Sequence, residues 1–207
     1  MSPEHHFLEP GDRCFFLWEY TPNRGYKFSE ANNLILNFKK SPERQGRPEW
    51  QYKEQAIEKI AEAFLRSLRT EWLRSVTLVP IPPSGAKGSP QYDDHMLRAL
   101  GRLDEKLGGS LDVRELILQR ESTVADHKAA QRQSLEDLIG NYRFNEQAAL
   151  SKPARIALFD DLLTTGRHFK AAEHLLRMRY PDTEILGIFV ARSSRTAIIK
   201  EMLMSGK

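Results

Sequence analysis

Residues 156–168 read IALFDDLLTTGRH, and this stretch decides how the chain is expected to fold. The apolar run RIALFD (155–160) predicts a buried strand, and GRHFKAAEHLLRMR (166–179) has the apolar spacing of an amphipathic helix. Between the strand and the helix come two acids, two leucines and a Thr-Thr-Gly triplet. In a parallel sheet, ligands bind outside the carboxyl ends of the strands, so this connection is the first place to search for a site.

The rest of the chain alternates short apolar segments with amphipathic ones. This alternation predicts an α/β fold, a Rossmann-like and mostly parallel sheet flanked by helices. Residues 1–13 are polar and are predicted to be loosely held. We expect strands at 14–20, 76–82, 115–119 and 184–192, helices at 49–74, 94–108 and the C-terminal end, loops at 41–48 and 121–134, and either a strand or a helix at 31–40.

Length and composition place limits on the kind of protein. The chain has 207 residues, a net charge of +3 and one cysteine, Cys14. This length can bury a sizeable core in one domain. A single cysteine excludes an intrachain disulfide framework and a cysteine-rich zinc site, and it suits a reducing compartment. No apolar run approaches the ~20 residues that span a bilayer, so we expect a cytoplasmic protein without a membrane partner.

The acidic pair needs partners that a simple turn does not supply. Asp160 and Asp161 follow five mostly apolar residues, and burying two carboxylates is costly unless hydroxyls, cations or a metal satisfy them. Vicinal ribose hydroxyls are suitable donors, while threonine hydroxyls and backbone amides around a glycine at a helix start form an anion nest. The stretch therefore predicts a ribose 5-phosphate site. The alternative is a plain turn in which Thr164 or Thr165 caps the helix.

The same residues resemble the signature that binds 5-phosphoribosyl-1-pyrophosphate (PRPP) in type I phosphoribosyltransferases. That resemblance implies a type I phosphoribosyltransferase fold, with Asp160 and Asp161 as the catalytic acids that hold the ribose. His168 departs from the pattern, which usually has Thr or Ser there; it could donate to the phosphate or only cap the helix. The loop that would wrap the 5-phosphate consists of Thr164, Thr165, Gly166, Arg167 and His168.

The family also has a loop that holds pyrophosphate and a flexible loop that covers the site. VTLVPIPPSGAKGS fits the first, with Ser84, Gly85, Ala86 and Lys87 as its binding residues, although it could be an ordinary surface loop. The polar stretch 121–134 lies where the flexible loop belongs. Arg120, Lys128 and Arg132 are candidate pyrophosphate contacts, or simply solvated charges. The resemblance implies Mg²⁺ as the cofactor, carried by PRPP, with no protein ligand assigned to it.

More narrowly, the layout is similar to the ComF-like competence-associated phosphoribosyltransferases, through NLILNFKK (33–40), LVPIPPS (78–84) and residues 118–145. Two departures stand out. The N-terminal four-cysteine zinc module common in that family is missing, and Ser-Pro-Gln-Tyr-Asp-Asp at 89–94 replaces an Arg-Gly-Phe-Asn-like stretch. The resemblance divides the chain into a tail and a hood-like strand region, residues 1–48, and a phosphoribosyltransferase core, residues 49–207.

The expected function is binding of PRPP and transfer of its phosphoribosyl group to an unidentified acceptor, with release of pyrophosphate. Two alternatives stay open: a non-catalytic sensor of PRPP or a nucleotide, and an adaptor for single-stranded nucleic acid. Expected partners are PRPP, its acceptor, and either a second copy of the chain or another protein. Nucleic acid is a further candidate, although the charge is too small to indicate it alone.

Overall fold

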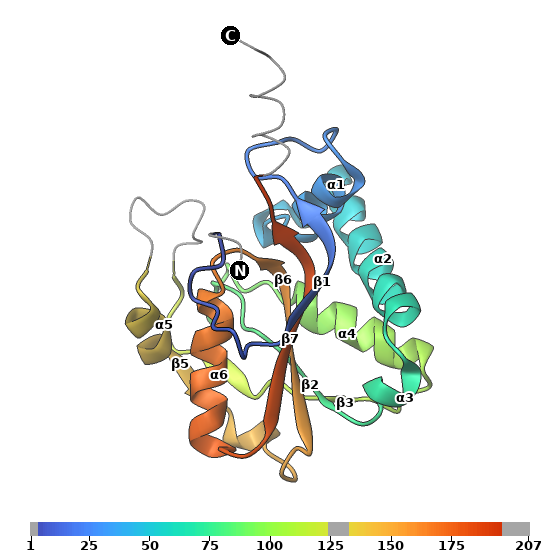
Figure 1. The fold of residues 1–207 in the computed structure, drawn as a ribbon. Helices are drawn as coiled ribbons and strands as arrows, with labels where there is room; N and C mark the ends of the chain where they lie inside the picture. The colour runs from blue at the N-terminus through green and yellow to red at the C-terminus, as the bar shows by residue number, and fades with distance from the viewer. Residues whose placement is uncertain (1–3, 124–132, 196–207) are drawn as a thin grey trace.

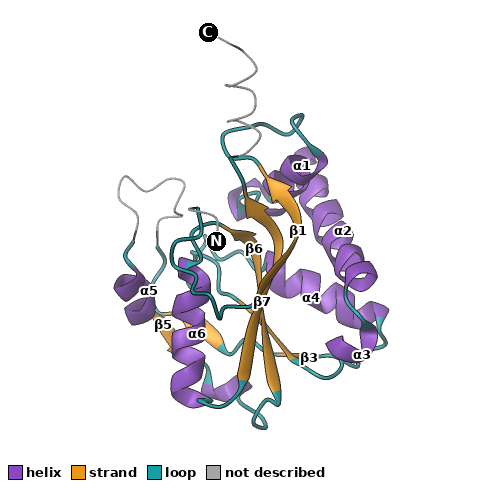
Figure 2. Cartoon of the chain, viewed as in Figure 1, coloured by secondary structure: helices purple, strands orange, loops and turns teal. Residues whose placement is uncertain are grey.

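The computed structural model describes residues 4–123 and 133–195. Within them a five-stranded parallel sheet lies between two layers of helices (Figure 2). The elements are β1 (Cys14–Tyr20), α1 (Glu30–Phe38), η1 (Pro42–Arg44), η2 (Pro48–Trp50), α2 (Gln51–Ser67), α3 (Thr70–Leu73), β2 (Thr77–Pro80), α4 (His95–Lys106), β3 (Asp112–Val113), β4 (Ile117–Gln119), α5 (Leu135–Asn141), β5 (Tyr142–Phe144), η3 (Glu146–Ala148), β6 (Arg155–Leu163), α6 (Arg167–Arg179) and β7 (Glu184–Ser193).

The strand order β1-β7-β6-β2-β3 places β6 and β7 inside the sheet. Helices α1, α2, α3 and α4 lie on one face, and α5 and α6 on the other (Figure 1). Side chains of β6 alternate between the two cores: Ala157 and Phe159 join the first, Ile156 and Leu158 the second. The predicted α/β class and parallel sheet are therefore confirmed. Strand β1, from the segment expected to form a hood, is an edge strand of this main sheet.

The segment that periodicity does not assign, residues 31–40, is helical. Ser29 is the N-cap of α1, and its side chain accepts a hydrogen bond from the amide of Asn32 at 3.0 Å. Asn32 is fully buried and bonds both backbone groups of Thr21. This cap, together with the buried amide, fixes where the helix begins and explains why the segment does not form a strand.

Three predicted elements differ from the structure. The segment at 115–119 is not a strand of the main sheet: its β4 pairs antiparallel with β5 in a separate sheet, and the two-residue β3 pairs with β2 instead. The helix expected over 49–74 is divided at Leu68, whose backbone is extended. Part of the N-terminal segment expected to be loosely held is packed: His5 is only 6% exposed, and Phe7 and Leu8 are half-buried, whereas residues 9–11 are exposed. The predicted C-terminal helix lies outside the described residues.

Strand β6 is longer than predicted, and this changes how the two acids are placed. Its pairing with β7 continues to Leu163, whereas its pairing with β2 ends at Phe159. Asp160 and Asp161 are therefore inside a strand that has lost one neighbour, and their side chains leave opposite faces of it. No helix within the described residues is both long and apolar enough to cross a membrane.

Candidate functional site

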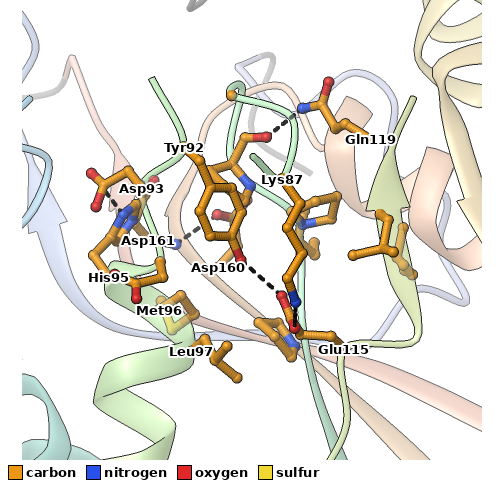
Figure 3. Close-up of a pocket in the computed structure, with 18 residues that line it drawn as sticks. Lys87, Tyr92, Asp93, His95, Met96, Leu97, Glu115, Gln119, Asp160 and Asp161 are labelled. Atoms are coloured by element: carbon orange, nitrogen blue, oxygen red, sulfur yellow. Dashed lines mark hydrogen bonds and ion pairs between the residues drawn. The ribbon is translucent and has the colours of Figure 1, made fainter. Parts of the chain in front are cut away.

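The candidate site lies at the carboxyl ends of β2 and β6. One pocket there is lined by both acids of β6, by Gly85 and Lys87 of the predicted pyrophosphate loop, and by His95 at the start of α4 (Figure 3). Because β6 extends beyond β2, its open edge faces the loop that follows β2. The structure thus brings together two groups of residues that are about 75 positions apart in the sequence, as the parallel-sheet rule leads one to expect.

Asp161 is a buried and firmly paired carboxylate. It is 5% exposed, and it accepts a hydrogen bond from Lys39 at 2.7 Å while His95 Nε2 lies 3.2 Å away. Burial alone raises the pKa of Asp161, but the charges and hydrogen bonds of Lys39 and His95 outweigh it and hold that pKa well below the usual range. Asp161 therefore stays ionised throughout the physiological range.

Asp160 has the opposite electrostatic character. Its Oδ1 accepts the backbone amide of Asp161 at 2.8 Å, and its side chain is partly exposed. Burial and the neighbouring charge of Asp161 raise the pKa of Asp160 to about 6, although His168 acts against them. One acid is thus permanently charged, and its neighbour exchanges a proton near neutral pH. Environments that separate two carboxylates in this way are common where one acts as an acid or base.

The predicted phosphate loop turns at a left-handed glycine immediately before a helix. Gly166 has φ +89°, a left-handed conformation that favours glycine, and α6 begins at the next residue. Within the described part of the chain, the amides of Thr164, Thr165 and Gly166 donate no hydrogen bond to the protein. Three donors at the positive end of a 13-residue helix are therefore left for a ligand, and an anion suits them.

The N-terminal segment holds this loop from its carbonyl side. Phe7 donates its amide to the carbonyl of Thr165 at 3.1 Å, and the ring of His5 contacts the carbonyl of Thr164. Leu8 lies so close to Gly166 that a Cβ there would be 2.6 Å from its side chain. The dark-blue segment beside α6 in Figure 1 is therefore part of the site's framework, and the prediction of a loose tail is wrong here.

The last two residues of the predicted loop make specific side-chain contacts. The Arg167 side chain is buried and donates to the carbonyl of Gln133, so its guanidinium is directed toward the connection before α5. Tyr142 Oη and His168 Nδ1 lie 3.0 Å apart. Because His168 lowers the pKa of Asp160, its ring is electrostatically close to the acids. His168, in the first turn of α6, is therefore oriented by a side chain of the second sheet.

The predicted pyrophosphate loop is tightly built around Gly85. A Cβ at this position would overlap the backbone of Gln91 and Tyr92. Only glycine therefore allows the loop backbone to lie this close to the segment before α4. The carbonyl of Ser84 accepts the amide of Thr123 at 2.8 Å, and Ser122 accepts the amide of Ala86 at 2.9 Å. The beginning of the predicted flexible loop is thus attached to the pyrophosphate loop.

Lys87 is engaged by an acid across the pocket. Its ammonium pairs with Glu115 at 2.5 Å, and Tyr92 donates to the other oxygen of that carboxylate at 2.8 Å (Figure 3). Lys87 is exposed, so this pair is weak enough for a more strongly charged anion to compete for the ammonium. The cation expected to bind pyrophosphate therefore has a resident counter-ion.

The flexible-loop candidates are only partly within the described structure. Arg120 is exposed, and its amide donates to the carbonyl of Asn141 at 2.8 Å; it is not among the residues that line the pocket. Lys128 and Arg132 lie outside the described residues. Gln119, next to Arg120, lines the pocket and donates to the carbonyl of Pro83, so this loop begins beside the pyrophosphate loop.

Sequence reasoning misses the charged residues that organise the acids. The sequence indicates Asp93 and His95 only as a helix start, and Glu115 only as part of a strand. Lys39 falls inside a segment that carries the resemblance, without a role of its own. No local pattern marks any of them, because each depends on contacts between distant segments. Among the described residues, no three His, Cys, Asp or Glu side chains are grouped so that they could hold a metal ion.

Neither a scan against models of protein families nor a search of curated proteins finds a match to this chain.

Proposed function

We propose that this protein binds PRPP at the carboxyl edge of its sheet, with the type I phosphoribosyltransferase arrangement, and transfers the phosphoribosyl group to an acceptor. One observation carries the proposal. The amides of Thr164, Thr165 and Gly166, which donate no hydrogen bond within the described residues, lie two leucines after a carboxyl pair that shares its pocket with a glycine–lysine loop. Anion donors, hydroxyl acceptors and a second cationic loop match the order of groups in PRPP.

Each part of the ligand has a suitable set of residues. The 5-phosphate would accept hydrogen bonds from the three amides and gain from the dipole of α6. The ribose hydroxyls would donate to the acids of β6. The pyrophosphate would lie against Ser84–Lys87, where Lys87 would exchange Glu115 for the ligand. Mg²⁺ enters the proposal as an ion bound to the pyrophosphate of the substrate.

The proposed reaction is a substitution at C1 of the ribose. A nucleophile forms a bond to C1 while the bond from C1 to the pyrophosphate oxygen breaks, and pyrophosphate leaves with both electrons. Lys87 would stabilise charge on the leaving group, and the carboxylates would stabilise positive charge that develops on the ring. Asp160, whose pKa is about 6, is suited to accept the proton that the nucleophile loses.

The contact between Lys87 and Glu115 favours a second candidate, a sensor that binds PRPP without turnover. A cation held by its own carboxylate stabilises a leaving group less well than a free one. Such a protein would respond to the ligand by releasing Glu115 and Tyr92, which are joined through this carboxylate. The two functions share the same site and differ only in whether pyrophosphate is released.

Calorimetry with the two halves of PRPP tests the proposal. Ribose 5-phosphate and pyrophosphate should each bind the wild-type protein, and Asp160→Asn should weaken only the first, whereas Lys87→Gln should weaken only the second. A pyrophosphate-release assay with PRPP, Mg²⁺ and a panel of nucleobases and amines then separates enzyme from sensor. Failure of both half-ligands and of PRPP to bind would rule out both functions.

A further inference from the structure

His95 lies between two carboxylates inside the protein. Its Nε2 is 3.2 Å from Asp161, and its Nδ1 is 3.0 Å from Asp93 in an ion-pair contact. The residue is 8% exposed, and its ring packs edge-on against Phe38 at a centroid distance of 4.5 Å. A neutral imidazole has one N–H and one lone pair, so it would present a lone pair to one of the acids. An imidazolium has an N–H on both nitrogens, so it donates to Asp161 through Nε2 and places its charge beside Asp93, to which Nδ1 makes the ion-pair contact without hydrogen-bond geometry.

The two acids on either side of His95 are each held by a lysine. Lys53 is fully buried and donates to Asp93 at 2.7 Å, and also to the carbonyls of Phe38 and Lys40 at 2.8 Å each. These carbonyls flank Lys39, which pairs with Asp161 at 2.7 Å. The contacts therefore close a ring, which we call the Lys53–His95 ring, and it ties α1, α2, the start of α4 and β6 together around Asp161.

When Asp160 is ionised, the charges in and beside the ring balance only with His95 protonated. The carboxylates in contact with His95 are Asp93 before α4 and Asp161 on β6. Lys53 on α2 pairs with the first and Lys39 at the end of α1 with the second, and Asp160 is the neighbour of Asp161 on the strand. Three carboxylates then meet two ammonium groups, and the imidazolium supplies the third positive charge. Burial alone lowers the pKa of His95, but Asp93 and Asp161 outweigh it and raise the pKa above its ordinary value.

We propose that His95 is a positioning residue whose imidazolium fixes Asp161 as a permanent carboxylate, which leaves Asp160 as the acid that contacts the ribose hydroxyls and exchanges a proton. This inference rests on the proposed function. It assigns different roles to Asp160 and Asp161, which the sequence alone does not distinguish. Asp161, tied to both Lys39 and His95, anchors the edge of the strand from which Asp160 reaches the ligand.

Binding should consequently depend on pH through His95. As pH rises through the pKa of His95, the ring loses its third cation, Asp161 loses a charged donor, and affinity for PRPP–Mg²⁺ should fall. A charged hydrogen bond of this kind corresponds to about a tenfold change in affinity. Calorimetry between pH 5.5 and 8.5 would show this alkaline limb in the wild-type protein. His95→Gln, which keeps one donor but no charge, should bind about tenfold more weakly and lack the limb.

A matched control and a ligand-free measurement keep the test decisive. His174 is exposed on α6, so His174→Gln should preserve the wild-type profile. NMR titration of the His95 ring should show a midpoint above the ordinary value for histidine, and Asp161→Asn should lower it. This titration needs no ligand, so it tests the protonation of His95 even where His95→Gln does not fold.

The outcomes separate this inference from the proposed function. If the wild-type protein does not bind PRPP–Mg²⁺, the proposed function is refuted. The NMR titration still decides whether His95 is an imidazolium between two acids. Wild-type binding that is matched by His95→Gln at every pH overturns the role of His95 while the proposed function stands. A His95 midpoint at or below the ordinary value for histidine overturns it as well.

Discussion

Asp160→Asn should make the protein more stable at pH 8. The pKa of Asp160 is raised from 3.8 to about 6, so its ionisation opposes folding once the pH exceeds the unfolded value. At about 1.4 kcal/mol per pH unit, this difference corresponds to about 3 kcal/mol when the carboxyl is fully ionised. Water screens part of the cost at this partly exposed side chain, so we expect a gain of roughly 1 to 2 kcal/mol.

Thermal and urea unfolding at several pH values measure this effect. Asparagine keeps the oxygen that accepts the amide of Asp161, so the change removes charge and little else. The melting temperature should rise by roughly 3 to 6 °C at pH 8, and the gain should vanish near pH 4, where the wild-type carboxyl is protonated. Asp161→Asn should instead lose roughly 2 to 4 kcal/mol, because Lys39 and His95 are left without their carboxylate. Equal or lower stability for Asp160→Asn at pH 8, or a gain that does not change with pH, would refute the reasoning.

Three further changes probe the framework of the site. Gly85→Ala should lower stability by at least about 2 kcal/mol in thermal unfolding, since its Cβ would overlap backbone, whereas Gly101→Ala in open space on α4 should be neutral or slightly stabilising. Lys53→Met should cost about 3 to 5 kcal/mol in urea unfolding because Asp93 loses its ammonium partner and two backbone carbonyls lose their donor; a loss below about 1 kcal/mol would count against the ring. Leu8→Ala should speed hydrogen exchange at the Thr-Thr-Gly loop several-fold, and unchanged exchange would show that the N-terminal segment does not support the loop.

Local patterns are sufficient to predict most of the sheet. Strands with continuous apolar runs, such as residues 155–160 and 184–192, are recognisable because a parallel sheet buries both of their faces. The segment at 115–119 has the same composition but belongs to the other sheet. An apolar composition indicates only that the segment is buried, and β4 is buried in the second sheet too. Local sequence therefore does not show which of the two sheets the segment joins.

The candidate site shows the same division between local and long-range information. The glycines at 85 and 166 are recognisable because a single residue type reports a backbone requirement. The different environments of Asp160 and Asp161 are not, because the difference arises from Lys39 and His95 on other elements and from the two extra residues by which β6 continues after the acids. Adjacent identical residues on a strand face opposite sides, and what each meets there depends on the tertiary structure.

Calorimetry of PRPP–Mg²⁺ binding tests whether the carboxyl edge of the sheet is a PRPP site. The comparison needs the wild-type protein, the double variant Asp160→Asn/Asp161→Asn, and Asp182→Asn, which removes an exposed acid after α6. We expect saturable one-to-one binding by the wild type and by Asp182→Asn, and loss of binding by the double variant while it remains folded by circular dichroism. Equal binding by the folded double variant, or no binding by the wild type, would contradict this expectation.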